Sequence, residues 1–89
     1  LMNIVLTQSH YDDSMWALLS NMPDGSRFLL RGNGLYLTQT AADKLALLKN
    51  VNAVVTESQQ LGLTPSSLVT PCSLSDWIQG ATHSPWATF

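Results

Sequence analysis

The chain has 89 residues, of which 45% are hydrophobic and only 11% charged, and its net charge is −2 at pH 7. This length accommodates one domain, so residues 1–89 are expected to fold as a single unit. Four lysines and arginines are too few to grip a phosphate backbone, and no apolar run approaches the roughly 20 residues of a membrane span, so we expect neither nucleic-acid nor membrane contact.

Four short aliphatic runs are the candidate strands. They lack the polar alternation of a half-exposed strand, which is typical of strands buried on both faces in a parallel sheet. They cover residues 2–7, 27–30, 52–55 and, with a weaker signal, 67–70.

The first helix is predicted to follow the N-capping residues Asp12 to Ser14 and to end at Pro23. Met15, Leu18, Leu19 and Met22 follow each other at helical spacing and are expected to form its buried face.

Three further helices begin at capping residues followed three positions later by a polar or acidic partner. They are predicted over residues 40–49, 56–61 and 73–81, beginning at Thr40, Thr56 and Ser73. Leu35 to Leu37 fits either a short extended segment or a helical turn. Trp86 and Phe89 form an aromatic tail that we expect to pack on the domain or on a partner.

This alternation of strands and helices predicts an α/β fold, with a parallel sheet covered by helices on both sides. The order of the strands cannot be read from the sequence.

Cys72 is the chain's only cysteine, so an internal disulfide is impossible and a reducing cytoplasm is the expected compartment. It precedes the last predicted helix, where backbone N–H groups favour a thiolate. It is therefore a candidate nucleophile, although a small, partly buried hydrophobic side chain in a turn fits the same position.

Arg31-Gly32-Asn33-Gly34 is a second candidate site. Two glycines can bring backbone N–H groups close to a phosphate, but the same residues also suit a turn with a positive φ angle. Cys72, His10 and His83 show no metal-ligand spacing, so we expect neither a metal nor a cofactor.

Several segments together resemble the DsrH/TusB family of small sulfur-relay proteins. The resemblance rests on residues 2–9, on Phe28-Leu29-Leu30 leading to Asn33-Gly34-Leu35-Tyr36, on Gln60-Leu61-Gly62-Leu63, and on Ser75-Asp76-Trp77-Ile78 running to Pro85. Each motif is loose, and their order and spacing carry the match.

The resemblance implies a three-layer α/β/α sandwich around a small, mainly parallel sheet of four to five strands. It also implies a heterohexamer with DsrE/TusD-like and DsrF/TusC-like subunits, which passes persulfide sulfur toward 2-thiolation of the wobble uridine of tRNA, or serves dissimilatory sulfur oxidation. The low charge agrees with a surface covered by other subunits, and a homo-oligomer of the chain alone is also possible.

Some DsrH members carry a cysteine in the first helix, and the matching position here is Leu18. Leucine cannot carry sulfur, so the resemblance implies a non-catalytic subunit. A persulfide carrier that uses Cys72 is the alternative. A third hypothesis is a binding module for a phosphorylated small molecule at Arg31 to Gly34.

Overall fold

A single sheet of five parallel strands runs through the computed structural model, which describes residues 1–81 and 83–89. The strands lie in the order β4-β3-β2-β1-β5. They are β1 (Asn3–Leu6), β2 (Arg27–Leu30), β3 (Val51–Val54), β4 (Thr70–Cys72) and β5 (Trp86–Thr88). The predicted α/β class and the parallel sheet of four to five strands are confirmed.

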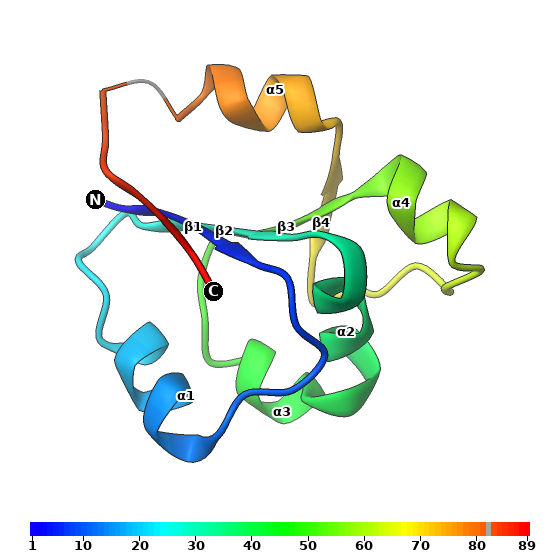
Figure 1. Ribbon diagram of the computed structural model, residues 1–89, viewed down its shortest axis with the longest axis horizontal. Coiled ribbons are helices and arrows are strands. Elements are labelled where there is room, and N and C mark those ends of the chain that lie inside the picture. The colour runs from blue at the N-terminus through cyan, green and yellow to red at the C-terminus, as the bar shows by residue number, and fades with distance from the viewer. Residues whose placement is uncertain (82) are drawn as a thin grey trace.

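Helices lie on both sides of the sheet and complete a three-layer sandwich, seen edge-on in Figure 1. They are α1 (Asp13–Ser20), the 3-10 helix η1 (Gly32–Tyr36), α2 (Leu37–Thr40), α3 (Ala42–Leu45), α4 (Val55–Gln60) and α5 (Leu74–Gln79). In Figure 1, α1 and α3 lie below the sheet and α5 lies above it, while α4 lies beside the carboxyl ends of the strands.

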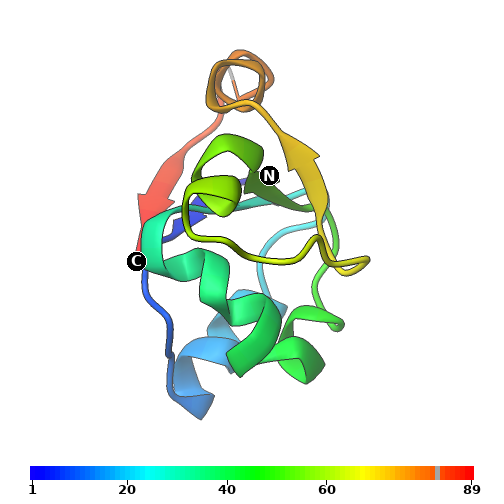
Figure 2. The same ribbon diagram turned by 90° about the vertical axis from the view of Figure 1, so that its right-hand side faces the viewer.

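The path of the chain explains why α5 lies on the face opposite α1 and α3. From β1 to β4 each connection steps to the next strand in one direction, but the connection from β4 to β5 runs back across the whole sheet. Crossovers between parallel strands are right-handed, so a reversal of direction places the connecting helix on the opposite face. Figure 2 shows the result, with β4 and β5 at opposite edges of the sheet.

The core is divided by the sheet into two clusters. Ile4, Leu6, Phe28 and Leu30 belong to the larger cluster, together with side chains of α1, α2 and α3. Val5, Leu29 and Val54 belong to the smaller one, with Trp77 and Ala81. Because successive strand residues point to opposite faces, burial on both faces requires the continuous apolar runs seen in the sequence.

Two predicted N-caps are confirmed. The Asp12 carboxylate accepts a hydrogen bond from the Met15 N–H (2.9 Å), and the Ser73 hydroxyl accepts one from the Asp76 N–H (3.2 Å).

The predicted buried face of the first helix is wrong at one position, because Trp16 and Leu19 are buried while Leu18 is 50% exposed. Trp16 lies on the buried face and packs edge-on against Tyr11, with ring centroids 5.9 Å apart.

The helix predicted over residues 40–49 is wrong in its limits. The chain becomes helical earlier, at η1, and breaks at Ala41 between α2 and α3. Thr40 is not an N-cap; it ends α2, and its hydroxyl donates a hydrogen bond to the Ser9 carbonyl (2.9 Å). α4 likewise begins at Val55 without a side-chain cap from Thr56.

The predicted strand over residues 67–70 is displaced, because β4 spans Thr70–Cys72 with Pro71 at its centre. Proline lacks a backbone N–H, which an edge strand tolerates.

The aromatic tail forms the fifth strand, β5, which pairs with β1, and Trp86 packs edge-on against Trp77 with ring centroids 5.2 Å apart. The expected packing of the tail on the domain is confirmed.

No helix in the described part of the chain combines the length and apolar character needed to cross a bilayer.

Gly34 brings η1 against the end of β1, where it leaves no space for a side chain. A Cβ atom added at Gly34 would overlap the backbone carbonyl of Leu6, whereas one added at Gly32 would meet nothing within 4 Å. Gly32 has a φ of 53°, so a side chain there is strained only by its backbone conformation.

We therefore expect Gly34→Ala to lower the free energy of unfolding by about 3 kcal/mol or more, since backbone has to move to relieve the overlap. Gly32→Ala is the matched control and should cost only about 1–2 kcal/mol, the cost of a left-handed residue. Urea unfolding followed by circular dichroism measures both. Equal losses in the two variants would contradict the packing described for Gly34.

Candidate functional site

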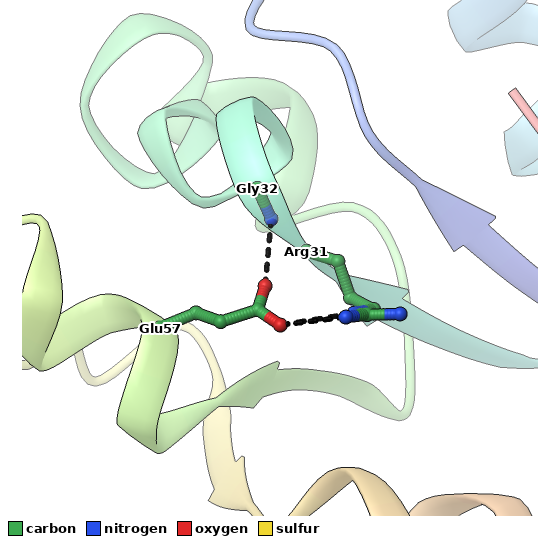
Figure 3. Close-up of polar contacts among 3 residues, drawn as sticks. All are labelled: Arg31, Gly32 and Glu57. Carbon is green, nitrogen blue, oxygen red and sulfur yellow. Dashed lines mark hydrogen bonds and ion pairs between the residues drawn. The ribbon is translucent and has the colours of Figure 1, made fainter.

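Arg31 and Glu57 form an ion pair at the carboxyl ends of two neighbouring strands (Figure 3). Arg31 directly follows β2, and Glu57 lies in the first turn of α4, which directly follows β3. Glu57 Oε2 accepts hydrogen bonds from Arg31 Nε (3.1 Å) and Nη2 (2.7 Å). Its Oε1 accepts one from the Gly32 backbone N–H (2.9 Å), so both carboxylate oxygens are engaged.

The ion pair shifts the acidity of Glu57. Hydrogen bonds from Arg31 hold the pKa of the Glu57 carboxyl below its usual value of 4.5, and the Gly32 N–H adds to this effect against partial burial. The two side chains are 40% and 25% exposed, so solvent screens much of their attraction.

The ion pair lies at one end of a groove on the sheet face that carries α5. The groove has a volume of about 380 Å³. It is lined by Val5, Thr7, Leu29, Arg31, Gly32, Glu57, Leu74, Ile78, Trp86 and Thr88. A crevice at the carboxyl ends of parallel strands is where open α/β sheets usually bind ligands.

α5 leaves this groove open because its carboxyl-terminal end is held over the opposite end of the strands. Arg27 Nη2 donates a hydrogen bond to the Trp77 carbonyl (3.0 Å), and Asn3 Nδ2 donates one to the Ala81 carbonyl (3.2 Å). Asn3 and Arg27 are the first residues of β1 and β2. The carboxyl halves of these strands, with Val5 and Leu29, therefore form the floor of the groove.

The structure favours the turn interpretation of Arg31 to Gly34 over the phosphate-binding one. Gly32 has the positive φ angle that the turn requires, and the Gly34 N–H donates to the Arg31 carbonyl (2.9 Å). The Gly32 N–H, which a phosphate would need, already donates to Glu57. The hypothesis of a phosphorylated ligand at this loop gains no support from this geometry.

Cys72 ends β4 and is half-buried, and like Leu74 it packs against the cluster around Trp77. Burial raises the pKa of its thiol above the usual 9.0, Arg27 acts in the opposite direction, and Asp76 raises it further. The thiolate expected from the following helix is therefore not favoured. A carrier role for Cys72 stays a prediction.

Leu18 points to solvent from the middle of α1, half-exposed. Among residues 1–81 and 83–89, no three histidine, cysteine or acidic side chains gather closely enough to hold a metal ion. His10 and His83, named with Cys72 as possible ligands, belong to no such group.

Glu57 is the functional candidate that the sequence reading missed. A glutamate in the first turn of a helix is ordinarily explained by the helix dipole, which gives no reason to link it to Arg31. The usable signal was a cation after one strand and an anion after the next, but it becomes informative only when β2 and β3 are known to be neighbours.

Comparison of the chain with protein-family models finds no match, and comparison with curated proteins finds none either.

Replacing Glu57 tests the ion pair. We expect Glu57→Gln to lower the free energy of unfolding by about 1 kcal/mol at pH 7, since a hydrogen-bonded charged pair contributes more than an exposed one but remains screened here. A depressed folded-state pKa stabilises the protein above pH 4.5 and ceases to do so as the pH falls through the folded-state value. Urea unfolding between pH 7 and pH 3 should show the two proteins converging below pH 4.5.

Asp13→Asn is the matched control for this substitution. Asp13 is 98% exposed and lies 3.7 Å from Lys44, so we expect a change of about 0.5 kcal/mol or less. A pH-independent loss in Glu57→Gln would mean that its carboxylate charge contributes nothing.

The raised pKa of Cys72 predicts slow alkylation. In the folded protein, the reaction of Cys72 with iodoacetamide should have a midpoint above pH 9.0, because burial disfavours the thiolate. The same thiol in the urea-unfolded chain is the reference and should react faster at pH 8. A folded-state midpoint below pH 9.0 would instead indicate an activated thiolate.

Proposed function

We propose that this chain is a non-catalytic subunit of a cytoplasmic sulfur-relay complex of the DsrEFH/TusBCD type. In this proposal it assembles with DsrE/TusD-like and DsrF/TusC-like subunits and serves 2-thiolation of the wobble uridine of tRNA. The sulfur-bearing thiol belongs to a sister subunit. This chain contributes surface and shape.

The observation that carries the proposal is the unreactive environment of Cys72, the only thiol in the chain. It is half-buried, its pKa is raised, and no histidine lies among the groups that shift that pKa. At the position where some DsrH members have a cysteine, Leu18 offers only a hydrocarbon side chain. A chain with these features is suited to assembly rather than to sulfur transfer.

The exposed apolar side chains support a role in assembly. Among the residues that the structure describes, six large hydrophobic ones are at least 39% exposed, in a chain with only 11% charged residues. They are Leu1, Leu18, Leu47, Leu61, Ile78 and Trp86. Single exposed leucines are ordinary, but a weakly charged surface that carries several of them favours contact with other subunits.

Co-expression with the two sister subunits tests the proposal. We expect this chain to co-purify with both in one complex, and to sediment at a far lower mass when expressed alone. A chain that stays separate from both sisters at micromolar concentration would contradict the proposal.

Sulfur labelling separates the subunit from the carrier. When a desulfurase supplies radioactive sulfur to the complex, we expect label on a sister subunit and none on Cys72. Cys72→Ser should leave the 2-thiouridine content of tRNA at the wild-type level, whereas loss of the whole subunit should abolish it. Label on Cys72, with loss of thiolation in Cys72→Ser, would support the persulfide-carrier alternative.

A further inference from the structure

Within residues 1–81 and 83–89, the outer edge of β5 presents backbone groups without a hydrogen-bond partner. Asn3 N–H donates to the Pro85 carbonyl (2.8 Å), Thr7 N–H donates to the Phe89 carbonyl (3.0 Å), and Phe89 N–H donates to the Val5 carbonyl (2.9 Å). Backbone groups alternate in direction along a strand. The N–H and C=O groups of Trp86 and Thr88 therefore point away from β1, on the open side of an edge strand.

The two edges of the sheet are protected differently. β4 carries Pro71 at its centre, a residue that discourages another strand from pairing there. β5 consists of Trp86, Ala87 and Thr88, so it has neither a proline nor a charge. Trp86 is also 47% exposed. An edge without these protections is a template for strand pairing.

β5 is also held rigidly in its extended form. The Phe89 carbonyl, just beyond the strand, accepts hydrogen bonds from the hydroxyls of Thr7 and Tyr11, each 2.8 Å long. The Tyr11 hydroxyl in turn accepts from the N–H groups of Thr7 and Gln8, both at 3.2 Å. A strand that is already ordered loses little conformational entropy when it pairs.

We propose that two copies of this chain pair through β5, antiparallel across a twofold axis, and join their sheets into one. An antiparallel pair centred on Ala87 places Trp86 of each copy opposite Thr88 of the other. Both residues of such a pair point their backbone groups at each other, so the two pairs exchange four hydrogen bonds. No charged side chain lies in the strand, so the copies meet without like-charge repulsion.

This pairing also extends the groove. Trp86 and Thr88 both line the groove, and a twofold axis perpendicular to the sheet places the grooves of both copies on the same face. Trp86 of the second copy then lies against Thr88, at the side where the groove is open. The second copy thus contributes an aromatic side chain to the candidate site. The inference is independent of the proposed function.

A disulfide across the axis tests the register. In the Cys72→Ser background, Ala87→Cys places two thiols at a non-hydrogen-bonded antiparallel pair, whose Cα atoms are about 4.5 Å apart and within disulfide range. Thr88→Cys in the same background is the control, because its two copies are offset by two residues along neighbouring strands, which places their Cα atoms about 8 Å apart and beyond the roughly 7 Å limit. We expect copper-phenanthroline to form covalent dimer at least about tenfold faster with Ala87→Cys, the better-placed pair.

Sedimentation tests the interface without an added thiol. Interfaces that bury less than about 1,200 Å² of surface belong to weak complexes. The wild-type chain is therefore measured up to about 200 μM, where its sedimenting mass should rise above the 9.7 kDa of one chain. Thr88→Pro removes an outward N–H that β1 does not use, and should sediment as a monomer. Thr88→Val keeps that N–H and should behave as wild type, with circular dichroism confirming that all variants fold.

The contrast between the two cysteine variants decides the proposal. Faster cross-linking of Ala87→Cys supports the pairing even where the sedimenting mass rises little. Equal cross-linking in both variants, with a wild-type mass of 9.7 kDa throughout, would overturn it and leave the edge to a strand from a different protein.

Discussion

The arrangement depends on Arg27, which fixes α5 over the sheet. Its guanidinium lies 4.5 Å from the centroid of the Trp77 ring and donates hydrogen bonds to the Trp77 carbonyl and to Asn3 Oδ1 (3.3 Å). A cation at the end of a helix also meets the negative pole of its dipole. Gly80 permits this contact, since a Cβ atom there would lie 3.1 Å from the guanidinium.

The strands that could be predicted are those whose own residues form a continuous apolar run. In β1 and β2 residues that point to either face are buried, so Val5 and Leu29 are as apolar as their neighbours, and the run is readable from the sequence. β4 and β5 have no such run. Their extended form comes from pairing at the edges, with β3 and β1 respectively, and neither a proline at position 71 nor a tryptophan at position 86 signals it.

Helix limits were predicted well where a side-chain cap exists and poorly elsewhere. Asp12 and Ser73 accept hydrogen bonds from the N–H groups that their spacing indicates. Thr40 and Thr56 have the same sequence pattern, yet contacts distant in sequence prevail at both. The Thr40 hydroxyl donates a hydrogen bond to the Ser9 carbonyl. α4 starts one residue early, at Val55, and its Glu57 pairs with Arg31.

The candidate site was predictable only in part, for the same reason. Arg31 and Cys72 were recognised as chemistry-bearing residues at the ends of strands. The partner of Arg31 could not be found, because the contact with Glu57 spans 26 positions and depends on the order of the strands. For Cys72 the sequence leaves a thiolate and a partly buried hydrophobic side chain open, and the structure favours the second, because burial raises the pKa of the thiol.

The groove follows from the geometry of a small sheet. Five strands spaced about 4.8 Å apart place the edge strands about 19 Å from each other, whereas one helix with its side chains is about 10 Å wide. One face is covered by α1, α2 and α3, but the other has α5 alone within the described residues. Arg27 holds the last turn of α5 over the amino-terminal ends of the strands, so the uncovered area falls at the carboxyl ends of β1 and β2, beside Arg31 and Glu57. The groove thus has an apolar floor next to a charged pair because one short helix is too narrow to cover the whole face of the sheet. Ile78 and Trp86 line this groove and are exposed because the helical layer does not extend over them.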